Sequence, residues 1–253
     1  MSSDNGSLRG KRVVVLGASR GVGREIVLRA SADGAQVLAV ARTTRDLDTL
    51  LMCVPGIKTL ALDAATEAAP LEVFRKGRPD LLVICGGAMP PVQPMSELSW
   101  DEFGVNWEVD VKMTFLFCRE ALRTPLAAGA TVVIISSGAG IGGSPISGGY
   151  AGAKRMQMFI AKYCQAESDR RKLDIRFVAL APSRIMPETG LGWAAVSGYA
   201  QYLDVTAEKF LETMGPRQSA SNVAEAVINI FEKPSTEAGS IFAISADGMA
   251  ALS

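Results

Sequence analysis

The amino-acid sequence predicts an α/β domain in which helices cover both faces of a doubly wound parallel sheet. Strand-like and helix-like segments alternate along the whole chain, which is the pattern of such sheets. A glycine-rich turn joins the first strand to the first helix. The length of 253 residues fits one domain of this kind, and no repeat or linker divides it. We therefore expect a single domain over residues 8–253, preceded by a disordered lead at residues 1–7.

Short apolar runs rich in β-branched residues predict seven strands, because strands buried on both faces read as continuous hydrophobic segments. The strands are expected near residues 12–17, 35–41, 57–62, 80–85, 131–136, 174–180 and 240–245. The helices are expected between them, near residues 21–32, 45–53, 66–76, 99–127, 149–172 and 219–232. The irregular stretch at residues 183–215 follows the carboxyl end of a strand, where ligands bind in such sheets, and is expected to form a substrate lid.

Composition narrows the possible functions. Hydrophobic residues make up 48% of the chain and its formal net charge is zero, so we expect a globular protein that binds neither nucleic acid nor membrane. No apolar stretch reaches membrane-spanning length, and the polar start has no hydrophobic signal region, which predicts a cytoplasmic protein. The absence of histidine excludes Ser-His-Asp and Cys-His nucleophiles and the usual histidine metal sites. Acid–base chemistry must then come from tyrosine, lysine or carboxylates, and no metal is expected.

The glycine-rich turn predicts a nucleotide site. The buried strand at residues 13–16 leads directly into glycines, and an amphipathic helix follows them. Glycines permit close approach of backbone N–H groups to phosphate oxygens, and the helix N-terminus favours a pyrophosphate. The alternative is a plain strand–helix turn whose small residues serve only packing. The candidate cofactor-binding residues here are Gly17, Ser19, Arg20, Gly21, Val22 and Gly23.

A tyrosine, a lysine and a serine form the candidate catalytic group. Tyr150 and Lys154 are four residues apart, which places them on one face of a helix. A fixed ammonium beside a phenol lowers its pKa and makes it a usable proton donor or acceptor near neutral pH. The Ser137 hydroxyl, at the end of a strand, could hold a substrate oxygen against that phenol. The alternative is an ordinary buried tyrosine, a surface lysine and a strand-end serine.

Together these motifs resemble those of the classical short-chain dehydrogenase/reductase family, and the resemblance runs from about Leu8 to Met249. The Gly-x-x-x-Gly-x-Gly spacing of the turn matches that family's cofactor loop. Ser137, thirteen residues before Tyr150, completes its catalytic Ser, Tyr and Lys, with Ser136 as a competitor for the serine role. The resemblance implies a Rossmann-like fold and hydride transfer between a nicotinamide and a carbonyl or secondary alcohol. Tyr150 would then donate the proton, and Lys154 would bind the nicotinamide ribose.

The end of the second strand indicates which nicotinamide cofactor is used. Family members that bind NAD generally place an acidic residue where this chain has Ala41. Arg42 follows it, and Arg20 in the glycine-rich turn can approach the same phosphate. Guanidinium groups bind a 2′-phosphate, and no competing acid is evident in the sequence, so NADP(H) is favoured over NAD(H). Thr43 could add a hydroxyl contact. The alternative is that both arginines are solvated surface charges.

The resemblance implies further cofactor contacts. Asp63 and Ala64 are expected to meet the adenine. Gly86 and Gly87 are expected beside the ribose, although Ile84-Cys85 replaces two asparagines of the family pattern. The nicotinamide contacts are expected from Pro182, Ser183 and Ile185, where serine replaces the usual glycine.

A fourth family residue is altered, because Asp110 stands where an asparagine normally holds a water that links the lysine to solvent. A carboxylate can accept a hydrogen bond from such a water or help to keep Lys154 charged. Asn106, one turn earlier, is a rival assignment with the wrong spacing to Ser137. We expect a proton relay with altered pH dependence, while weakened or lost activity stays open.

The expected lid is apolar, which predicts a substrate with substantial hydrophobic surface. Its apolar residues are Leu191, Trp193, Val196, Tyr199, Tyr202 and Leu203, with Met89, Pro90, Pro91 and residues 138–147 completing the pocket. The same residues could instead pack a lid helix or a subunit contact. The family resemblance also implies a homo-oligomer, a tetramer or a dimer. The rival function is a catalytically weakened NADP(H)-binding regulatory or scaffold protein.

Overall fold

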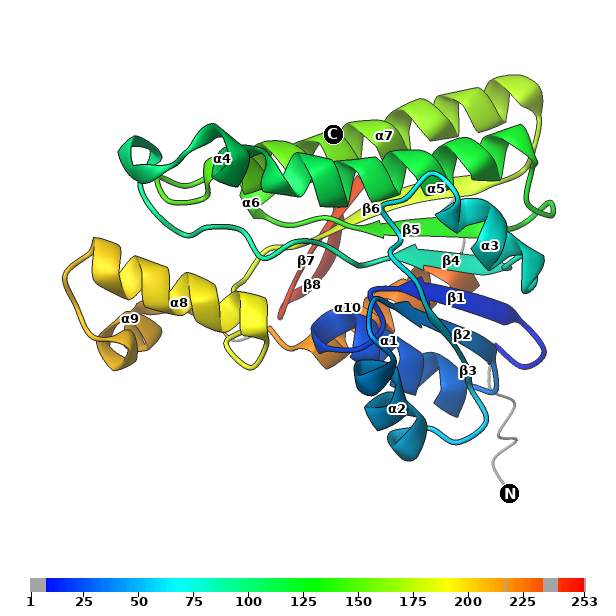
Figure 1. Ribbon diagram of the computed structural model, residues 1–253, viewed down its shortest axis with the longest axis horizontal. Coiled ribbons are helices and arrows are strands. Elements are labelled where there is room, and N and C mark those ends of the chain that lie inside the picture. Colours follow the sequence, from blue (N-terminus) through cyan, green and yellow to red (C-terminus); the bar gives the residue numbers. More distant parts are fainter. Residues whose placement is uncertain (1–7, 217, 234–240, 253) are drawn as a thin grey trace.

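The computed structural model describes residues 8–216, 218–233 and 241–252, and the predicted lead at residues 1–7 lies outside them. These residues form one sheet with helices on both faces (Figure 1), which confirms the doubly wound α/β fold. The strands follow the order β3-β2-β1-β4-β5-β6-β7-β8. Their bounds are β1 Arg12–Leu16, β2 Gln36–Ala41, β3 Lys58–Ala61, β4 Leu81–Ile84, β5 Thr131–Ile135, β6 Arg176–Pro182, β7 Ile241–Ser245 and β8 Gly248–Ala251.

The strand count was wrong by one, because the described residues form eight strands where seven were expected. Strands β1 to β7 pair in parallel, and β8 pairs antiparallel with β7 at the edge of the sheet. All four residues of β8 are exposed, and its short Gly-Met-Ala-Ala sequence lacks the β-branched and aromatic residues that mark strands.

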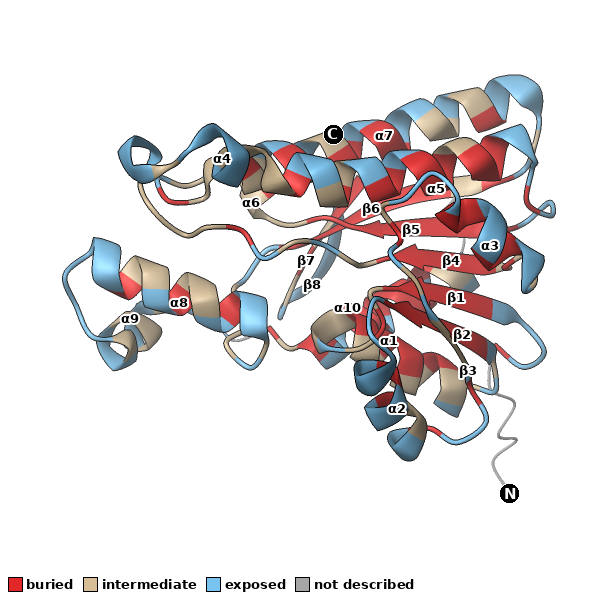
Figure 2. Cartoon of the chain, in the orientation of Figure 1, coloured by how far each residue is buried: buried red, intermediate tan, exposed pale blue. Residues whose placement is uncertain are grey.

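Alternate residues of each central strand supply two separate cores. In β1, Val13 and Val15 face α1 (Gly21–Ala32), α2 (Thr44–Cys53) and α10 (Ala220–Glu232). Val14 and Leu16 face α3 (Ala69–Arg75), α5 (Lys112–Arg123) and α7 (Gly148–Arg171) on the opposite side. Figure 2 shows the central strands buried along their length, as expected for a sheet covered on both faces.

Two expected segments differ from the observed structure. The single helix expected over residues 99–127 is divided into α4 (Trp100–Asn106), a π-helix η2 (Trp107–Val111) and α5. The expected irregular lid contains α8 (Gly190–Tyr202) and α9 (Ala207–Thr213), which project from one end of the sheet in Figure 1. The sequence of α8 contains three glycines and mostly apolar or small residues, so it shows no helical periodicity. The remaining short helices are η1 (Met95–Glu97) and α6 (Ala139–Gly142).

The direction of winding reverses between β1 and β4, and this places the site. Connections run from β1 outward to β2 and β3 on one side, and through β4 to β7 on the other. Ligands of such sheets bind in the crevice at the carboxyl ends of the strands where this reversal occurs. Within the described residues, none of the helices has the length and hydropathy needed to cross a bilayer.

Candidate active site

A cavity of about 610 Å³ opens at the carboxyl ends of β1, β2, β4, β5 and β6. Its wall includes Ser137, Tyr150, Lys154 and Asp110, the four candidate catalytic residues. The candidate cofactor residues also line it, with the exception of Gly23. The structure therefore brings together in one cavity residues that lie up to about 170 positions apart in the sequence.

The glycine-rich turn forms one end of this cavity because side chains would not fit there. A Cβ on Gly17 would collide with the backbone of Gly86, and Gly17 has φ +77°, in the left-handed region. A Cβ on Gly23 would collide with the carbonyl oxygen of Gly17. Gly23 thus allows the start of α1 to pack closely against the turn. It faces the backbone of the turn, which explains why Gly23 does not line the cavity. Its sequence-based role as a direct cofactor contact becomes one of packing.

The N-terminus of α1 is left available for a ligand. The N-cap residue Arg20 makes no side-chain capping bond, and the first turn of α1 carries no acidic residue. The first N–H groups of a helix have no partner within the helix, and the helix dipole adds partial positive charge there. Together with the backbone approach at Gly17, this arrangement fits a pyrophosphate.

At the carboxyl end of β2, the cavity wall carries both cationic side chains and an acidic one. Arg42 and Thr43, which follow Ala41, line the cavity. Arg20, from the glycine-rich turn, lines it as well. However, Asp46 from the first turn of α2 also lines it, and its Oδ2 accepts a hydrogen bond of 2.7 Å from the Thr43 hydroxyl. The expectation that no acid competes at this end was therefore wrong. The carboxylate lies in the first turn of α2, where the helix dipole favours an acid, and its sequence position alone does not distinguish this role from a ligand contact.

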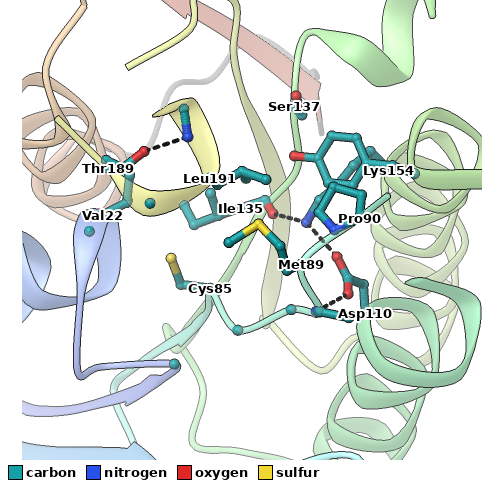
Figure 3. A pocket seen from close by; sticks show the side chains of 18 of the residues that line it. Val22, Cys85, Met89, Pro90, Asp110, Ile135, Ser137, Lys154, Thr189 and Leu191 are labelled. Atoms are coloured by element: carbon teal, nitrogen blue, oxygen red, sulfur yellow. Dashed lines mark hydrogen bonds and ion pairs between the residues drawn. The ribbon is translucent and has the colours of Figure 1, made fainter. Parts of the chain in front are cut away.

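Lys154 is the most constrained member of the catalytic group. Its Nζ lies 3.1 Å from the Asp110 carboxylate and donates a hydrogen bond of 3.3 Å to the carbonyl oxygen of Ile135 (Figure 3). Nζ also lies 5.5 Å from the centroid of the Tyr150 ring. Burial opposes the charge on Lys154, but the attraction of Asp110 and then of Tyr150 outweighs it and raises the pKa of the lysine. The lysine is therefore held as a cation beside the phenol.

The two adjacent serines have different environments. The buried Ser136 hydroxyl donates a hydrogen bond of 2.8 Å to the backbone carbonyl of Lys154, which ties β5 to α7. The Ser137 Oγ accepts a weaker bond of 3.2 Å from the Ala139 N–H, and its hydroxyl donates to no group in the described part of the chain. This arrangement favours Ser137 over Ser136 as the residue that could meet a substrate oxygen.

Asp110 contacts the lysine directly. Its Oδ1 accepts a hydrogen bond of 2.9 Å from the Ala88 N–H, while its Oδ2 faces Lys154. A Cβ at Gly87 would lie 2.7 Å from Oδ2, so glycine is required for this approach. This contact is the geometry of a counter-ion for the lysine, one of the two roles considered for Asp110. Asn106 is also buried but neither lines the cavity nor bonds Lys154.

The substrate end of the cavity is largely apolar. Its lining there includes Met89, Pro90, Pro91 and Val92 after β4, Ile146 before α7, and Leu191, Ala195 and Tyr199 of α8. Trp193, Tyr202 and Leu203, which the sequence also assigned to the lid, do not line the cavity and are about half exposed. Val196, on the inner face of α8, is fully buried and does not line the cavity. Of the six apolar residues named for the lid, Leu191 and Tyr199 line the cavity, and the lid function itself stays a prediction.

Several lining residues were missed from the sequence. Cys85 lines the cavity at the end of β4, and burial raises the pKa of its thiol to about 12, so it is a neutral group there. Other missed lining residues follow strands β3 and β4: Leu62, Ala65, Ala88 and Val92. Their positions after strand ends were a usable signal, although their side-chain types were not.

The fold and cavity define a nucleotide-binding α/β protein of the Rossmann class. The sequence matches the short chain dehydrogenase family over residues 11–197, so the chain belongs to that family and to its oxidoreductases. It is 32% identical to the L-xylulose reductase of Bos taurus over 192 residues, 75% of this chain and 77% of that protein. It is 27% identical to "Carbonyl reductase [NADPH] 2" of Sus scrofa over 241 residues, 92% and 94% of the two chains.

Solved structures agree on the fold. The structure of an NAD+-bound xylitol dehydrogenase superimposes with a TM-score of 0.80 at 18% sequence identity, covering 92% of this chain and 96% of that one.

Proposed function

We propose that this protein is an NADP(H)-dependent oxidoreductase that interconverts a carbonyl compound and the corresponding secondary alcohol. The observation that carries the proposal is the pairing of buried Lys154 with Asp110 next to the Tyr150 ring, in the same cavity as the glycine-rich turn. A buried cation held beside a phenol favours loss and return of the phenolic proton. Reductases among the family relatives support this reaction class.

In the reductive direction, Tyr150 donates its hydroxyl proton to the carbonyl oxygen, and Ser137 donates a hydrogen bond to the same oxygen. Lys154 stabilises the phenolate that forms, and its remaining N–H is free to bind ribose hydroxyls. When bound, the dihydronicotinamide supplies the hydride that reduces the carbonyl carbon. Most of the rate gain comes from fixed orientation and from charges that are already in place before reaction.

The preference for NADP(H) rests on Arg42, Arg20 and the neutral Ala41. Guanidinium groups bind a 2′-phosphate through charge-assisted hydrogen bonds. The names of relatives are mixed on this point, since one carries NADPH and a structural neighbour holds NAD+. Asp46 opposes the preference, but its Oδ2 is engaged by the Thr43 hydroxyl.

For the substrate, we propose an apolar carbonyl compound. Met89, Val92 and Leu191 give the substrate end a mainly apolar wall, and the Ser144 and Ser147 hydroxyls are among the few polar groups there. This differs from the sugar named for the Bos taurus relative. A direct comparison of an aryl ketone with L-xylulose as substrates would separate the two.

The test of the proposed function is a panel of ketones and aldehydes assayed by NADPH absorbance. We expect turnover by the wild type and its loss in Tyr150→Phe. Tyr163→Phe is the matched control, because Tyr163 lies on the same helix, is 61% exposed and does not line the cavity. NADPH binding without turnover of any compound would favour the rival function, a regulatory or scaffold protein.

We also propose that the protein is a homo-oligomer and that it acts in the cytoplasm. Large aromatic side chains lie exposed on η2, α5 and α7, including Trp107, Phe115, Phe159 and Tyr163. Clusters of exposed aromatics on soluble proteins commonly mark protein interfaces. Light scattering on the wild type and on Phe159→Glu/Tyr163→Glu would test the assembly, and a monomeric wild type would contradict it.

A further inference from the structure

Asn106 is a buried polar side chain that the proposed mechanism does not use. It is the last residue of α4, only 1% exposed, and lies immediately before the π-helix η2. Its Nδ2 donates a hydrogen bond of 3.1 Å to the Ala88 carbonyl and lies 3.3 Å from the Asp110 Oδ1. Its Oδ1 is buried without a partner among the described residues. A buried oxygen without a hydrogen-bond partner is destabilising. Any stabilisation from the Asn106 side chain must therefore come from the hydrogen bonds of its Nδ2 group.

Asn106 and Asp110 hold the Ala88 peptide from both sides. The N–H of Ala88 donates to Asp110, and its carbonyl oxygen accepts from Asn106. These two residues are four apart: Asn106 immediately precedes the π-helical turn and Asp110 lies within it. The wider hydrogen-bond spacing of π-helical turns marks functional segments of helices in many proteins. The result is a clamp, here defined as Asn106, Asp110 and the Ala88 peptide.

The clamped peptide lies in the middle of a cavity wall. Gly86 and Gly87 precede it on the cofactor side, and Met89 follows it on the substrate side. The two glycines have no side chains with which to fix the segment, and they are intrinsically permissive in conformation. The clamp therefore sets the path of a wall segment that both reactants would touch. The same Asp110 carboxylate holds Lys154, so the wall and the lysine share one buried network.

We propose that Asn106 is a positioning residue for the reaction, acting through the Ala88 peptide and the Asp110 carboxylate. This inference rests on the proposed function. Loss of the Nδ2 donor would leave the Ala88 carbonyl unpaired and release the wall segment, and small misplacements of reactants have large effects on rate. We expect the Asn106→Leu variant to lose about tenfold to a hundredfold in kcat/KM, with cofactor affinity weakened as well.

The Asn106→Asp variant gives the sharper readout. A protonated carboxyl at this position can donate to the Ala88 carbonyl as the amide does, whereas an ionised one cannot. Ionisation would also place a second carboxylate beside Asp110, and like charges raise the pKa of one member of such a pair. Other titratable groups that face the Asp110 carboxylate are Lys154 on α7, with Tyr150 beyond it, and Cys85 at the end of β4.

The experiment compares pH profiles of kcat/KM for the wild type, Asn106→Leu and Asn106→Asp. We expect the Asp variant to approach wild-type turnover at acidic pH and to fall toward the Leu variant as pH rises. In the Leu variant, kcat/KM should be lower than in the wild type by the same factor at every pH. Thr114→Val is the matched control, because Thr114 is fully buried one turn after Asp110 and bonds Gln157 and the Asp110 backbone but not Ala88. It should keep the wild-type profile, even if its thermal stability falls.

A wild-type profile in Asn106→Asp, or kcat/KM within twofold of wild type in Asn106→Leu, would overturn the inference while leaving the proposed function intact. If the Leu variant does not fold, the pH profile of the Asp variant decides alone. If the wild type binds NADPH but reduces no carbonyl compound, the proposed function fails instead. The inference is then judged by NADPH affinity, where an unchanged dissociation constant in both variants would overturn it.

Discussion

The two ends of the cavity are built in different ways. At the end formed by the glycine-rich turn, the wall is backbone, and its shape depends on the absence of side chains at Gly17 and Gly23. At the catalytic end, buried polar side chains hold the wall, through contacts such as those of Asp110 with Lys154 and Ala88. The first design is local in sequence, whereas the second joins β4, η2, α7 and β5.

This difference has energetic consequences. In the glycine-rich turn, an added side chain would collide with main-chain atoms and force them to move. At the catalytic end, removal of one polar side chain would leave a buried charge or hydrogen-bond donor without its partner. We therefore expect substitutions at the catalytic end to have the larger effect on folding, and those at the glycine end to act mainly on cofactor binding.

The largest effect is expected from Asp110→Leu. It would leave the buried Lys154 ammonium without its counter-ion, which typically costs about 3–5 kcal/mol. Urea unfolding of the variant against the wild type measures this. Glu212→Leu is the control, since it removes an ion pair between Glu212 and Lys209 whose side chains are 67% and 68% exposed. A loss at Asp110 no larger than that at Glu212 would contradict the role of the buried pair.

The milder Asp110→Asn variant tests the same pair through pH. Asp110 raises the pKa of Lys154, so the stabilisation from this pair is complete below the unfolded lysine pKa and is lost only as pH rises through the higher folded value. Without the carboxylate, burial dominates and the pKa of Lys154 falls. We expect the alkaline limb of kcat/KM to move to lower pH in the variant. An unmoved limb would show that Lys154 does not depend on Asp110 for its charge.

Next in size is Gly23→Ala. The new Cβ would meet the Gly17 carbonyl oxygen, so the start of α1 must move away from the turn. We expect a destabilisation of about 1–3 kcal/mol and loss of measurable NADPH binding by fluorescence titration. Gly104→Ala, on α4, is the matched control, because no atom lies within 4 Å of its added Cβ. Retained NADPH affinity in Gly23→Ala would mean that the turn is not a close-packed cradle.

The same contrast explains what the sequence predicted and what it did not. Short apolar runs predict strands β1 to β7, and the spacing of the glycines predicts the turn. Both are local signals in the sequence. The π-helix η2 left no such signal, because the apolar pattern of residues 99–127 continues through it. The place of Asp46 in the cavity, and the contact of Asn106 and Asp110 with Ala88, depend on how distant segments pack. Residue pattern alone does not carry that information.

A smaller effect is expected at the end of β2, where Arg42 and Asp46 oppose one another. Arg42→Asp should weaken NADPH binding much more than NADH binding, because it replaces a phosphate-binding cation by an anion. Asp46→Asn should strengthen NADPH binding severalfold, since the remaining amide does not repel a 2′-phosphate. Dissociation constants for both cofactors measure this. Equal losses of NADPH and NADH in Arg42→Asp would remove the basis for the cofactor preference.

The smallest effect is expected at the lid. Leu191 lines the cavity and is 38% exposed, whereas Trp193, two residues later on α8, is 50% exposed and does not line it. Truncating a partly buried apolar contact to substrate costs about 1 kcal/mol, so Leu191→Ala should raise KM for an apolar ketone about fivefold with little change in kcat. Trp193→Ala should leave both constants unchanged. If Trp193→Ala raises KM as much as Leu191→Ala does, α8 must close further over the cavity when substrate binds, and the lid would then act by movement rather than as a fixed apolar wall.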